Sequence, residues 1–326
     1  MNWKTLSLAL GASLLGSSAL LAQDRVWLDT DLGPIFIQLD RENTPITSQN
    51  FLDYVEAGYY DGIVFHRVIN NFVIQAGGFD RNLQARTPIG PTIPSESASG
   101  GDNLPGSIAM ALRGGDANSG QNEFYINTRP NPNLDELFTV FGQVVYGQST
   151  VTAIEQLGTA TSFVGNRRFD DVPASPPAIQ RASIINGDGF PIMPALAGSW
   201  FENSNPGFGF NVEVAQDIFS DDGARLVVYW YDYIDGEQLW LAGNGSYTYG
   251  DTEVTMELTT WDGFGEVGFQ APPPGDQIIS VGTLTVRFLS CNAAEFSYEI
   301  TGLGSASDAF EVSRLSLPES GGCPAD

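Results

Sequence analysis

Two neighbouring residues, His66 and Arg67, are the first candidates for chemistry in this chain of 326 residues. They lie in the stretch FHRVINNFVIQAGGF, residues 65–79. His66 is the only histidine and no cysteine lies near it, so a nucleophile–base triad cannot be completed, and we interpret it as structural. Arg67 is permanently charged and carries a rigid fork of N–H donors. That fork suits either a catalytic contact to an electron-rich atom or a structural salt bridge.

The spacing of cysteines and carboxylates favours a disulfide and gives no sign of a metal site. Cys291 and Cys323 are the only cysteines, and their separation does not fit a CxxC motif. In an oxidising compartment such a pair is more often a disulfide than a metal or redox site. The acidic stretches at 29–31 and 221–223 lack EF-hand spacing and are predicted to be turns. We expect neither a metal nor a cofactor.

The first 22 residues are typical of a secretory signal peptide. Lys4 precedes an apolar run over residues 6–15, and small residues lead to a predicted cleavage site near Ala22. The run is too short for a membrane anchor, and we expect a periplasmic or secreted bacterial protein. Lys4 is the only lysine, so the remaining chain carries 13 arginines against 39 acids. This charge disfavours nucleic acid and anionic membranes as partners.

The chain divides near a segment rich in Gly, Pro and Ala at residues 187–198. We predict a signal peptide over 1–22, a first domain over 23–188, a linker over 189–197 and a β-rich accessory domain over 198–326. The accessory domain carries 20 acids and three arginines, so it is much more acidic than the first domain. This asymmetry of charge supports two separate units.

The first domain has two predicted helices among many short strands. Apolar alternation around Gly33-Pro34 predicts a hairpin over residues 26–39. Thr44 is a predicted helix cap, Pro45 suits the first helical position, and Gly58 ends that helix. The remaining signals are a helix over 149–157 and strands over 63–69, 72–77, 106–112, 123–128, 138–145 and 178–185. Short strands with two helices indicate a barrel or sandwich rather than a parallel α/β sheet.

The second domain is predicted to be all-β, either a sandwich or a barrel. Residues 225–243, RLVVYWYDYIDGEQLWLAG, have two apolar-aromatic runs around Asp235-Gly236, which is a strong hairpin signal. A second strand pair is predicted over 282–289 and 294–300. Four of the six tryptophans lie in this domain. Its aromatic rings could stack on a glycan or a peptide, although packing in a core is the commoner role.

The order and spacing of several motifs over residues 24–186 resemble the cyclophilin-type peptidyl-prolyl cis-trans isomerases. The segments that carry the resemblance are FHRVINNFVIQAGGF, GSIAMAL, NEFYINT and LDELFTVFGQVVYG. The family implies a closed antiparallel barrel of eight strands flanked by two helices. It also implies no cofactor, and Xaa-Pro bonds of unfolded or partly folded proteins as substrates. In the family the arginine at the position of Arg67 is catalytic, and the histidine at the position of His66 is structural.

The resemblance assigns the other site residues position by position. Gln75 matches the glutamine that orients the arginine and contacts the substrate. Ala111 and Leu112 match the edge that pairs with the substrate backbone. The residues implied for the substrate pocket are Phe72, Val73, Phe124, Leu134 and Phe138.

Glu123 departs from the family pattern, because it replaces a glutamine of the motif. Its carboxylate either pairs with Arg67 and competes with the substrate, or fixes the guanidinium in position. The sequence as a whole predicts an exported prolyl isomerase. One alternative is a catalytically silent cyclophilin fold whose C-terminal β domain binds a peptide or glycan. Another is a chain whose C-terminal region is the functional part.

Overall fold

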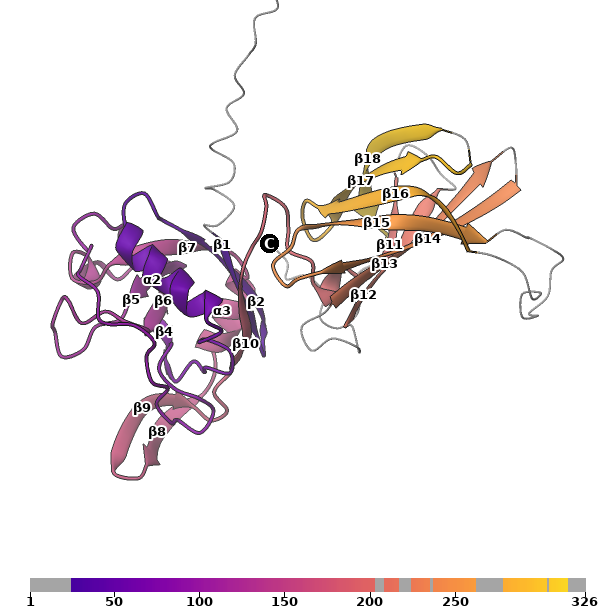
Figure 1. Ribbon diagram of the computed structural model, residues 1–326. Coiled ribbons are helices and arrows are strands. Elements are labelled where there is room, and N and C mark those ends of the chain that lie inside the picture. Colours follow the sequence, from indigo (N-terminus) through magenta and orange to yellow (C-terminus); the bar gives the residue numbers. More distant parts are fainter. Residues whose placement is uncertain are drawn as a thin grey trace, which may run out of the picture.

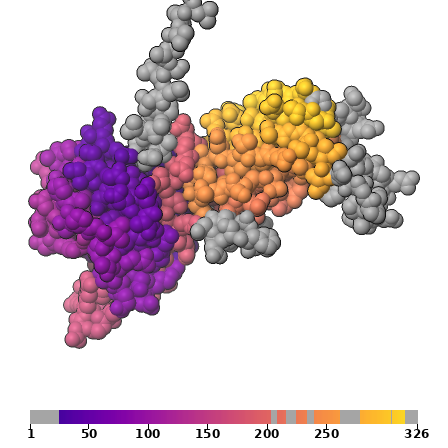
Figure 2. Space-filling view, in the orientation of Figure 1, coloured from indigo at the N-terminus to yellow at the C-terminus, as the bar shows by residue number. Residues whose placement is uncertain are grey.

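The computed structural model describes residues 25–202, 208–216, 224–234, 237–261, 278–303 and 305–315. Both the expected signal peptide and Cys323 lie outside these described residues. Two β-rich bodies follow one another along the chain and meet at a junction between them (Figure 1 and Figure 2). The N-terminal body also carries two α-helices, so the chain is mainly β, as expected.

The N-terminal body is built on an eight-stranded sheet with the order β10-β1-β2-β7-β5-β6-β4-β3. All of the pairings in this sheet are antiparallel. The strands are β1 (Arg25–Thr30), β2 (Gly33–Leu39), β3 (Arg67–Ile69), β4 (Val73–Ala76), β5 (Ser107–Met110), β6 (Phe124–Asn127), β7 (Val140–Tyr146) and β10 (Ile179–Ile184).

The two edge strands of this sheet, β10 and β3, do not pair with each other. The gap between them is bridged by the residues that precede both strands. Val64 and Ala178 form an antiparallel bridge, and the backbone N–H of Phe65 donates to the carbonyl of Pro177 over 2.9 Å. The expected eight-stranded barrel is therefore closed by these short connections rather than by a continuous ladder.

The inner face of this sheet holds an aromatic core, which α2 (Pro45–Glu56) and α3 (Gln148–Glu155) help to cover. Pro45 begins α2 as predicted, but the side chain of Thr44 does not cap it. The Glu96 carboxylate does so instead, accepting from the backbone N–H groups of Ile46 and Thr47 over 3.0 and 2.7 Å. A carboxylate suits this place because a helix N-terminus carries unpaired donors and partial positive charge.

A second, two-stranded sheet was not among the predicted elements. It is a hairpin of β8 (Thr159–Val164) and β9 (Arg167–Pro173). Its turn includes Gly165, whose φ of 59° suits glycine. The hairpin packs on the barrel through Phe169, which lies edge-to-face on Phe79 with ring centroids 5.2 Å apart. Strand β9 thereby reaches the end of the sheet that β3 occupies.

The C-terminal body is a closed barrel in which each strand pairs antiparallel with the next and β11 pairs with β18. This decides between the sandwich and the barrel. Its inner face is filled by large side chains, among them Trp200, Phe210, Phe288 and Phe296. The strands are β11 (Gly198–Phe201), β12 (Gly209–Gln216), β13 (Ala224–Ile234), β14 (Glu237–Tyr247), β15 (Glu253–Trp261), β16 (Ile278–Phe288), β17 (Ala293–Ile300) and β18 (Ala306–Arg314).

The segment between the two barrels is packed rather than loose. It includes the short 3₁₀ helix η2 (Pro194–Leu196). Phe190 and Ile192 are buried, and their N–H groups donate to carbonyls of the C-terminal barrel over 2.7 and 2.8 Å. One apolar cluster joins these side chains to Trp27 on the outside of the first barrel and to the interior of the second. The guanidinium of Arg181 stacks 3.9 Å from the ring centroid of Tyr249 and adds a polar contact between the bodies.

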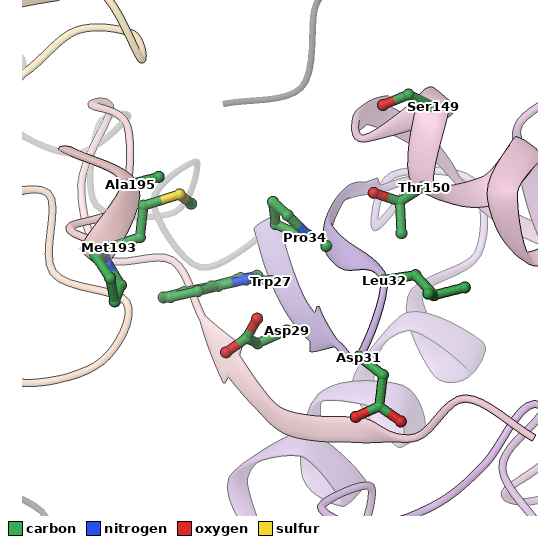
Figure 3. Close-up of a pocket in the computed structure, with 11 residues that line it drawn as sticks. Trp27, Asp29, Asp31, Leu32, Pro34, Ser149, Thr150, Met193 and Ala195 are labelled. Atoms are coloured by element: carbon green, nitrogen blue, oxygen red, sulfur yellow. The ribbon is translucent and has the colours of Figure 1, made fainter. Parts of the chain in front are cut away.

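A groove of about 630 Å³ opens along this junction, as Figure 3 shows. Trp27, Asp29 and Pro34 of the β1–β2 hairpin line one side, and Met193 and Ala195 line the other. None of the predicted site residues lies in it. Within the described residues no helix has the length and apolar character needed to cross a membrane.

Candidate active site

Arg67 and Gln75 face each other across the β3–β4 pair. The guanidinium Nη1 of Arg67 donates to the Oε1 of Gln75 over 3.3 Å, and its Nε lies 3.8 Å from the Oδ2 of Asp171 on β9. The Arg67 side chain is still 39% exposed. An amide oxygen and a carboxylate therefore hold the arginine, while part of its side chain remains exposed to solvent.

Glu123 reaches the arginine only through Gln75. The Nε2 of Gln75 donates to Oε2 of Glu123 over 2.9 Å, which leaves Oε1 of the same amide to accept from Arg67. Within the described part of the chain Glu123 forms no ion pair with Arg67. Of the two roles considered for this carboxylate, the geometry agrees with fixing the site rather than with direct pairing.

A pair of glycines makes room for the Glu123 side chain. A Cβ at Gly78 would lie 2.7 Å from Oε1 of Glu123, and Gly77, with a φ of 106°, passes against the backbone of Asn122. Only glycine combines that backbone conformation with so close an approach. The missing side chains of Gly77 and Gly78 thus leave the space beside which the Glu123 side chain lies.

Burial shifts the pKa values of the two ionisable groups next to the arginine, Glu123 and His66. Desolvation raises the pKa of Glu123, while its bond from Gln75 and the charges of Arg113 and Arg167 act in the opposite direction. Desolvation also lowers the pKa of His66 to about 4. The Nε2 of His66 lies 3.5 Å from Glu123, and its ring lies edge-on to Phe79. His66 is therefore neutral at pH 7, and its contact with the carboxylate is not an ion pair.

An apolar surface adjoins Arg67 on the outer face of the sheet. Register places Arg67, Gln75, Tyr125 and Ala109 in one row across β3, β4, β6 and β5. Around this row lies a cluster that we call the outer apolar cluster. Its members are Phe72, Val73, Ala109, Ala111, Tyr125, Leu134, Phe138 and Val140.

Five of the predicted pocket and edge residues belong to this cluster: Phe72, Val73, Ala111, Leu134 and Phe138. They come from β4 and the loop before it, the position directly after β5, the 3₁₀ helix η1 (Pro132–Leu134) and the loop before β7. Leu112 lies beside them and lines a small hollow of about 30 Å³ together with Ala111 and Glu123. The structure thus brings residues that are up to 66 positions apart in the sequence to one surface.

Phe124 is the exception among the predicted residues, and its assignment has to be corrected. It is fully buried in the inner core, edge-to-face with Phe51 and Tyr60. A side chain in this position cannot contact a ligand on the outer face. The neighbouring Tyr125 occupies that face, with its ring 5.7 Å from that of Phe138. Because successive residues of a strand point to opposite faces, period-two alternation over 124–127 could have identified Tyr125.

Tyr125 is anchored by buried asparagines that the sequence analysis did not single out. Its hydroxyl donates to the Oδ1 of Asn103 over 2.8 Å, and Asn127 donates to the same atom over 3.1 Å. Asn131 continues the network, donating to Oδ1 of Asn127 and to the carbonyl of Phe72. Burial raises the pKa of Tyr125 and keeps the phenol neutral. This layer fixes the loops that carry the outer apolar cluster.

Asp171 was also missed. It lies in the unpredicted hairpin with a φ of 59°, an uncommon conformation for a residue with a side chain. Its contact with Arg67 joins positions 104 residues apart, so no local pattern could have indicated it.

Comparison with known proteins gives consistent matches. A family model described as "Cyclophilin type peptidyl-prolyl cis-trans isomerase/CLD" matches residues 25–184. Peptidyl-prolyl cis-trans isomerase cyp18 of Streptomyces antibioticus is 38% identical over 168 residues, which cover 49% of this chain and 98% of that protein. Peptidyl-prolyl cis-trans isomerase A of Dickeya dadantii is 38% identical over 165 residues, covering 49% and 84%. The peptidyl-prolyl cis-trans isomerase of Acinetobacter baylyi is 37% identical over 163 residues, covering 48% and 85%.

Proposed function

Because the chain belongs to the family of cyclophilin-type peptidyl-prolyl cis-trans isomerases, we propose that Arg67 is its catalytic residue and that the outer apolar cluster holds the prolyl ring. The observation that carries this proposal is the row of Arg67, Gln75 and Tyr125 across neighbouring strands. It puts a fixed cation next to an apolar surface on the accessible face of the sheet.

The reaction explains why a cation and an apolar surface suffice. Rotation about an Xaa-Pro bond has a barrier of about 20 kcal/mol because amide resonance must be broken. No covalent bond is cleaved, so the site needs no nucleophile. As the amide twists, the lone pair on the prolyl nitrogen is no longer delocalised and can accept a hydrogen bond. A donor aimed at that nitrogen stabilises the twisted amide more than the planar one, which lowers the barrier.

Arg67 is suited to supply that donor. A guanidinium has five N–H groups, and the contacts within the described chain engage Nη1 with Gln75 and Nε with Asp171. The second N–H of Nη1 and both N–H groups of Nη2 are left for a ligand. Because the two contacts hold the fork from different sides, little side-chain freedom has to be lost when substrate binds, and preorganised donors of this kind give the largest catalytic effects.

The outer apolar cluster supplies the binding surface for proline. Phe72, Tyr125 and Phe138 provide aromatic faces and Leu134 an aliphatic one. A neutral Tyr125 tied to Asn103 presents a fixed wall without a charge to be desolvated. Burying the prolyl ring there excludes water next to Arg67 and strengthens its contact with the prolyl nitrogen.

The test is isomerisation of a short Xaa-Pro peptide by the full-length protein and two arginine variants. Arg67→Ala is expected to lower kcat/KM about 100-fold or more, the usual cost of removing one preorganised donor. Arg287→Ala, which removes a guanidinium from the C-terminal barrel, serves as the matched control and should retain activity. Equal activity of Arg67→Ala and wild type would contradict the assignment.

We further propose that the clients are unfolded or partly folded proteins outside the cytoplasm. The signal-like residues 1–22 and the single lysine, Lys4, support export. Export also supports a disulfide between Cys291, which is buried, and Cys323. Cell fractionation would locate the mature protein in the periplasm or the medium, and mass spectrometry without reductant would detect the Cys291–Cys323 peptide pair. A cytoplasmic, reduced protein would contradict both.

A further inference from the structure

The outside of the C-terminal barrel carries a row of aromatic side chains. Strand register places Phe201 opposite Gly209, Gly209 opposite Tyr231 and Tyr231 opposite Trp240, so one line crosses β11, β12, β13 and β14. Trp240 is 51% exposed and Tyr231 is 36% exposed. Tyr229, 37% exposed, lies two residues from Tyr231 on the same face. These rings belong to the outer surface rather than to the core, and we call them the aromatic row.

The aromatic row is notched rather than flat. Gly209 has no side chain, so a gap remains between Phe201 and Tyr231, and a hollow of about 380 Å³ opens there. The rings of Tyr231 and Trp240 stand at 90° to each other with centroids 5.2 Å apart. A glycan that stacks on two neighbouring rings needs them to face the same way. Two perpendicular rings in contact instead leave a corner beside them, in which a compact ring such as pyrrolidine can pack.

The same side chains carry hydrogen-bonding groups that the described chain does not use. Among the described residues the indole N–H of Trp240 and the hydroxyls of Tyr229 and Tyr231 have no hydrogen-bond partner. Asn211 and Ser199 lie in the next row of the same face. A polyproline II segment has no internal hydrogen bonds, so its carbonyls are available to accept from such donors.

Charge favours a cationic ligand over an anionic one. Glu213 and Glu257 are exposed on this face, two positions along their strands from the row that holds Tyr229. The surrounding domain has 20 acids against three arginines. Among the described residues each strand of the barrel already has a neighbouring strand on both sides, which leaves little edge for a peptide to pair with. Recognition by side chains is the mode that remains for an extended polypeptide on this surface.

We propose that the aromatic row binds proline-rich segments of extended polypeptides that also carry basic residues. Aromatic grooves are a general solution for polyproline II recognition, because the ligand is already extended and loses little entropy on binding. The choice of a proline-rich ligand rests in part on the proposed function, since clients of a prolyl isomerase carry Xaa-Pro bonds. The row would hold such a client on the same molecule as Arg67.

The experiment measures fluorescence anisotropy of a labelled peptide of three Pro-Pro-Arg repeats, titrated with the full-length protein. Trp240→Ala and Tyr231→Ala are expected to raise Kd about 10-fold each, as for aromatic residues at the centre of a binding site. A Ser-Ser-Arg peptide should bind more weakly than the proline peptide, and added salt should weaken both. Ile278→Ala removes another exposed apolar side chain of the same barrel and should leave Kd unchanged.

Arg67→Ala, tested with the same peptide, separates the aromatic row from the isomerase site. The proposal is supported if Trp240→Ala and Tyr231→Ala raise the Kd of the proline peptide and Arg67→Ala leaves it unchanged. It is overturned if Kd is unchanged in Trp240→Ala and Tyr231→Ala, or if neutral oligosaccharides but not the proline peptide bind through Trp240. The wild type could also bind the proline peptide through Trp240 and yet isomerise no Xaa-Pro peptide. That result would contradict the proposed function but would support the binding site.

Discussion

The two barrels of this protein use their outer faces in different ways. In the N-terminal barrel the strands next to Arg67 are three or four residues long, and loops surround them. In the C-terminal barrel several strands are 11 residues long and the ladder is continuous. Short strands let loops and 3₁₀ turns bring side chains such as Phe72 and Leu134 beside the sheet. Among the described residues, the long strands leave an outer surface made mainly of their own side chains.

The two rows of side chains also differ in how firmly hydrogen bonds hold them. Arg67, Gln75 and Tyr125 are each tied by hydrogen bonds to Glu123, Asn103 or to one another. The rings of the aromatic row make no such bonds within the described residues. Chemistry needs groups held in one geometry, whereas binding of variable segments tolerates side chains that can adjust. This difference supports the two proposals, catalysis at the first row and adaptable binding at the second.

The largest effect on stability is expected for a substitution on strand β6, whose two faces should respond differently. Phe124→Ala is expected to lower the free energy of unfolding by about 3–5 kcal/mol, because a fully buried aromatic ring leaves a cavity. Tyr125→Leu should cost less stability and should lower kcat/KM, since it alters the outer apolar cluster. Urea unfolding and peptide isomerisation on both variants provide the check. Similar stability loss in both, with activity unchanged in Tyr125→Leu, would contradict the corrected assignment.

The next effect concerns pH and belongs to the N-terminal barrel alone, since the chain's only histidine lies there. Burial lowers the pKa of His66 from 6.5 to about 4, so between these values the unfolded chain binds a proton that the folded chain does not. The contribution of this group to the free energy of unfolding is fully present above pH 6.5 and is lost as the pH falls toward 4. The total loss is about 3 kcal/mol.

Urea unfolding at pH 7 and pH 5 in wild type and His66→Asn measures this loss. Arg67 and Arg167 also disfavour the charged imidazole, and both remain in the variant. Glu123 contributes with the opposite sign, because its raised pKa makes stability fall as the pH rises through it. That contribution is common to both proteins, so the smaller loss expected in His66→Asn reports on the histidine. An equal loss in both would show that His66 is not the group responsible.

A third prediction tests whether Glu123 acts through Gln75. Protonated Glu123 is no longer only an acceptor, so the Gln75 amide can turn and withdraw Oε1 from Arg67. Wild-type kcat/KM should therefore fall on the acid side as the pH drops through the raised pKa of Glu123. Glu123→Gln keeps an oxygen that can accept from Gln75 but has no titratable group, so it should retain activity at pH 7 and lack this acid limb. Stopped-flow isomerisation from pH 4.5 to 8 decides, and an acid limb that persists in the variant would refute the role.

The smallest effect is expected in the C-terminal barrel. Arg287 and Glu295 form a pair at 3.3 Å, and both side chains are more than a third exposed. Exposed pairs contribute about 0–1 kcal/mol, so Arg287→Ala should change the free energy of unfolding by no more than that. Urea denaturation with and without added salt measures it. A loss of several kcal/mol would mean that this surface is more constrained than its exposure indicates.

Much of the N-terminal site could be predicted because family motifs fix residue order. Arg67, Gln75, Phe72 and Leu134 were expected at one site, and the structure brings them to one face. The assignment of Phe124 to the pocket was wrong because the motif was matched one residue out of register. Such a shift moves a strand residue to the opposite face of the sheet. Asp171 could not be found, because its contact depends on how a separate hairpin packs against β3.

In the C-terminal half the pattern of alternation correctly predicted two strand pairs, β13–β14 and β16–β17. It did not predict the aromatic row, because Phe201, Tyr231 and Trp240 become neighbours only through the register of four strands. Register between strands is set by turn geometry and packing as well as by local sequence. The sequence could say that this half is rich in aromatic residues, but not which of them lie outside.

The most direct test of the account replaces Arg67 by lysine and measures kcat/KM for a short Xaa-Pro peptide. Lysine keeps the positive charge but loses the rigid fork that Gln75 and Asp171 hold. If an oriented donor does the catalysis, Arg67→Lys should lose about 100-fold in kcat/KM while retaining wild-type stability. Wild-type activity in Arg67→Lys would mean that charge alone suffices and would contradict the central claim that the held guanidinium is the catalytic group.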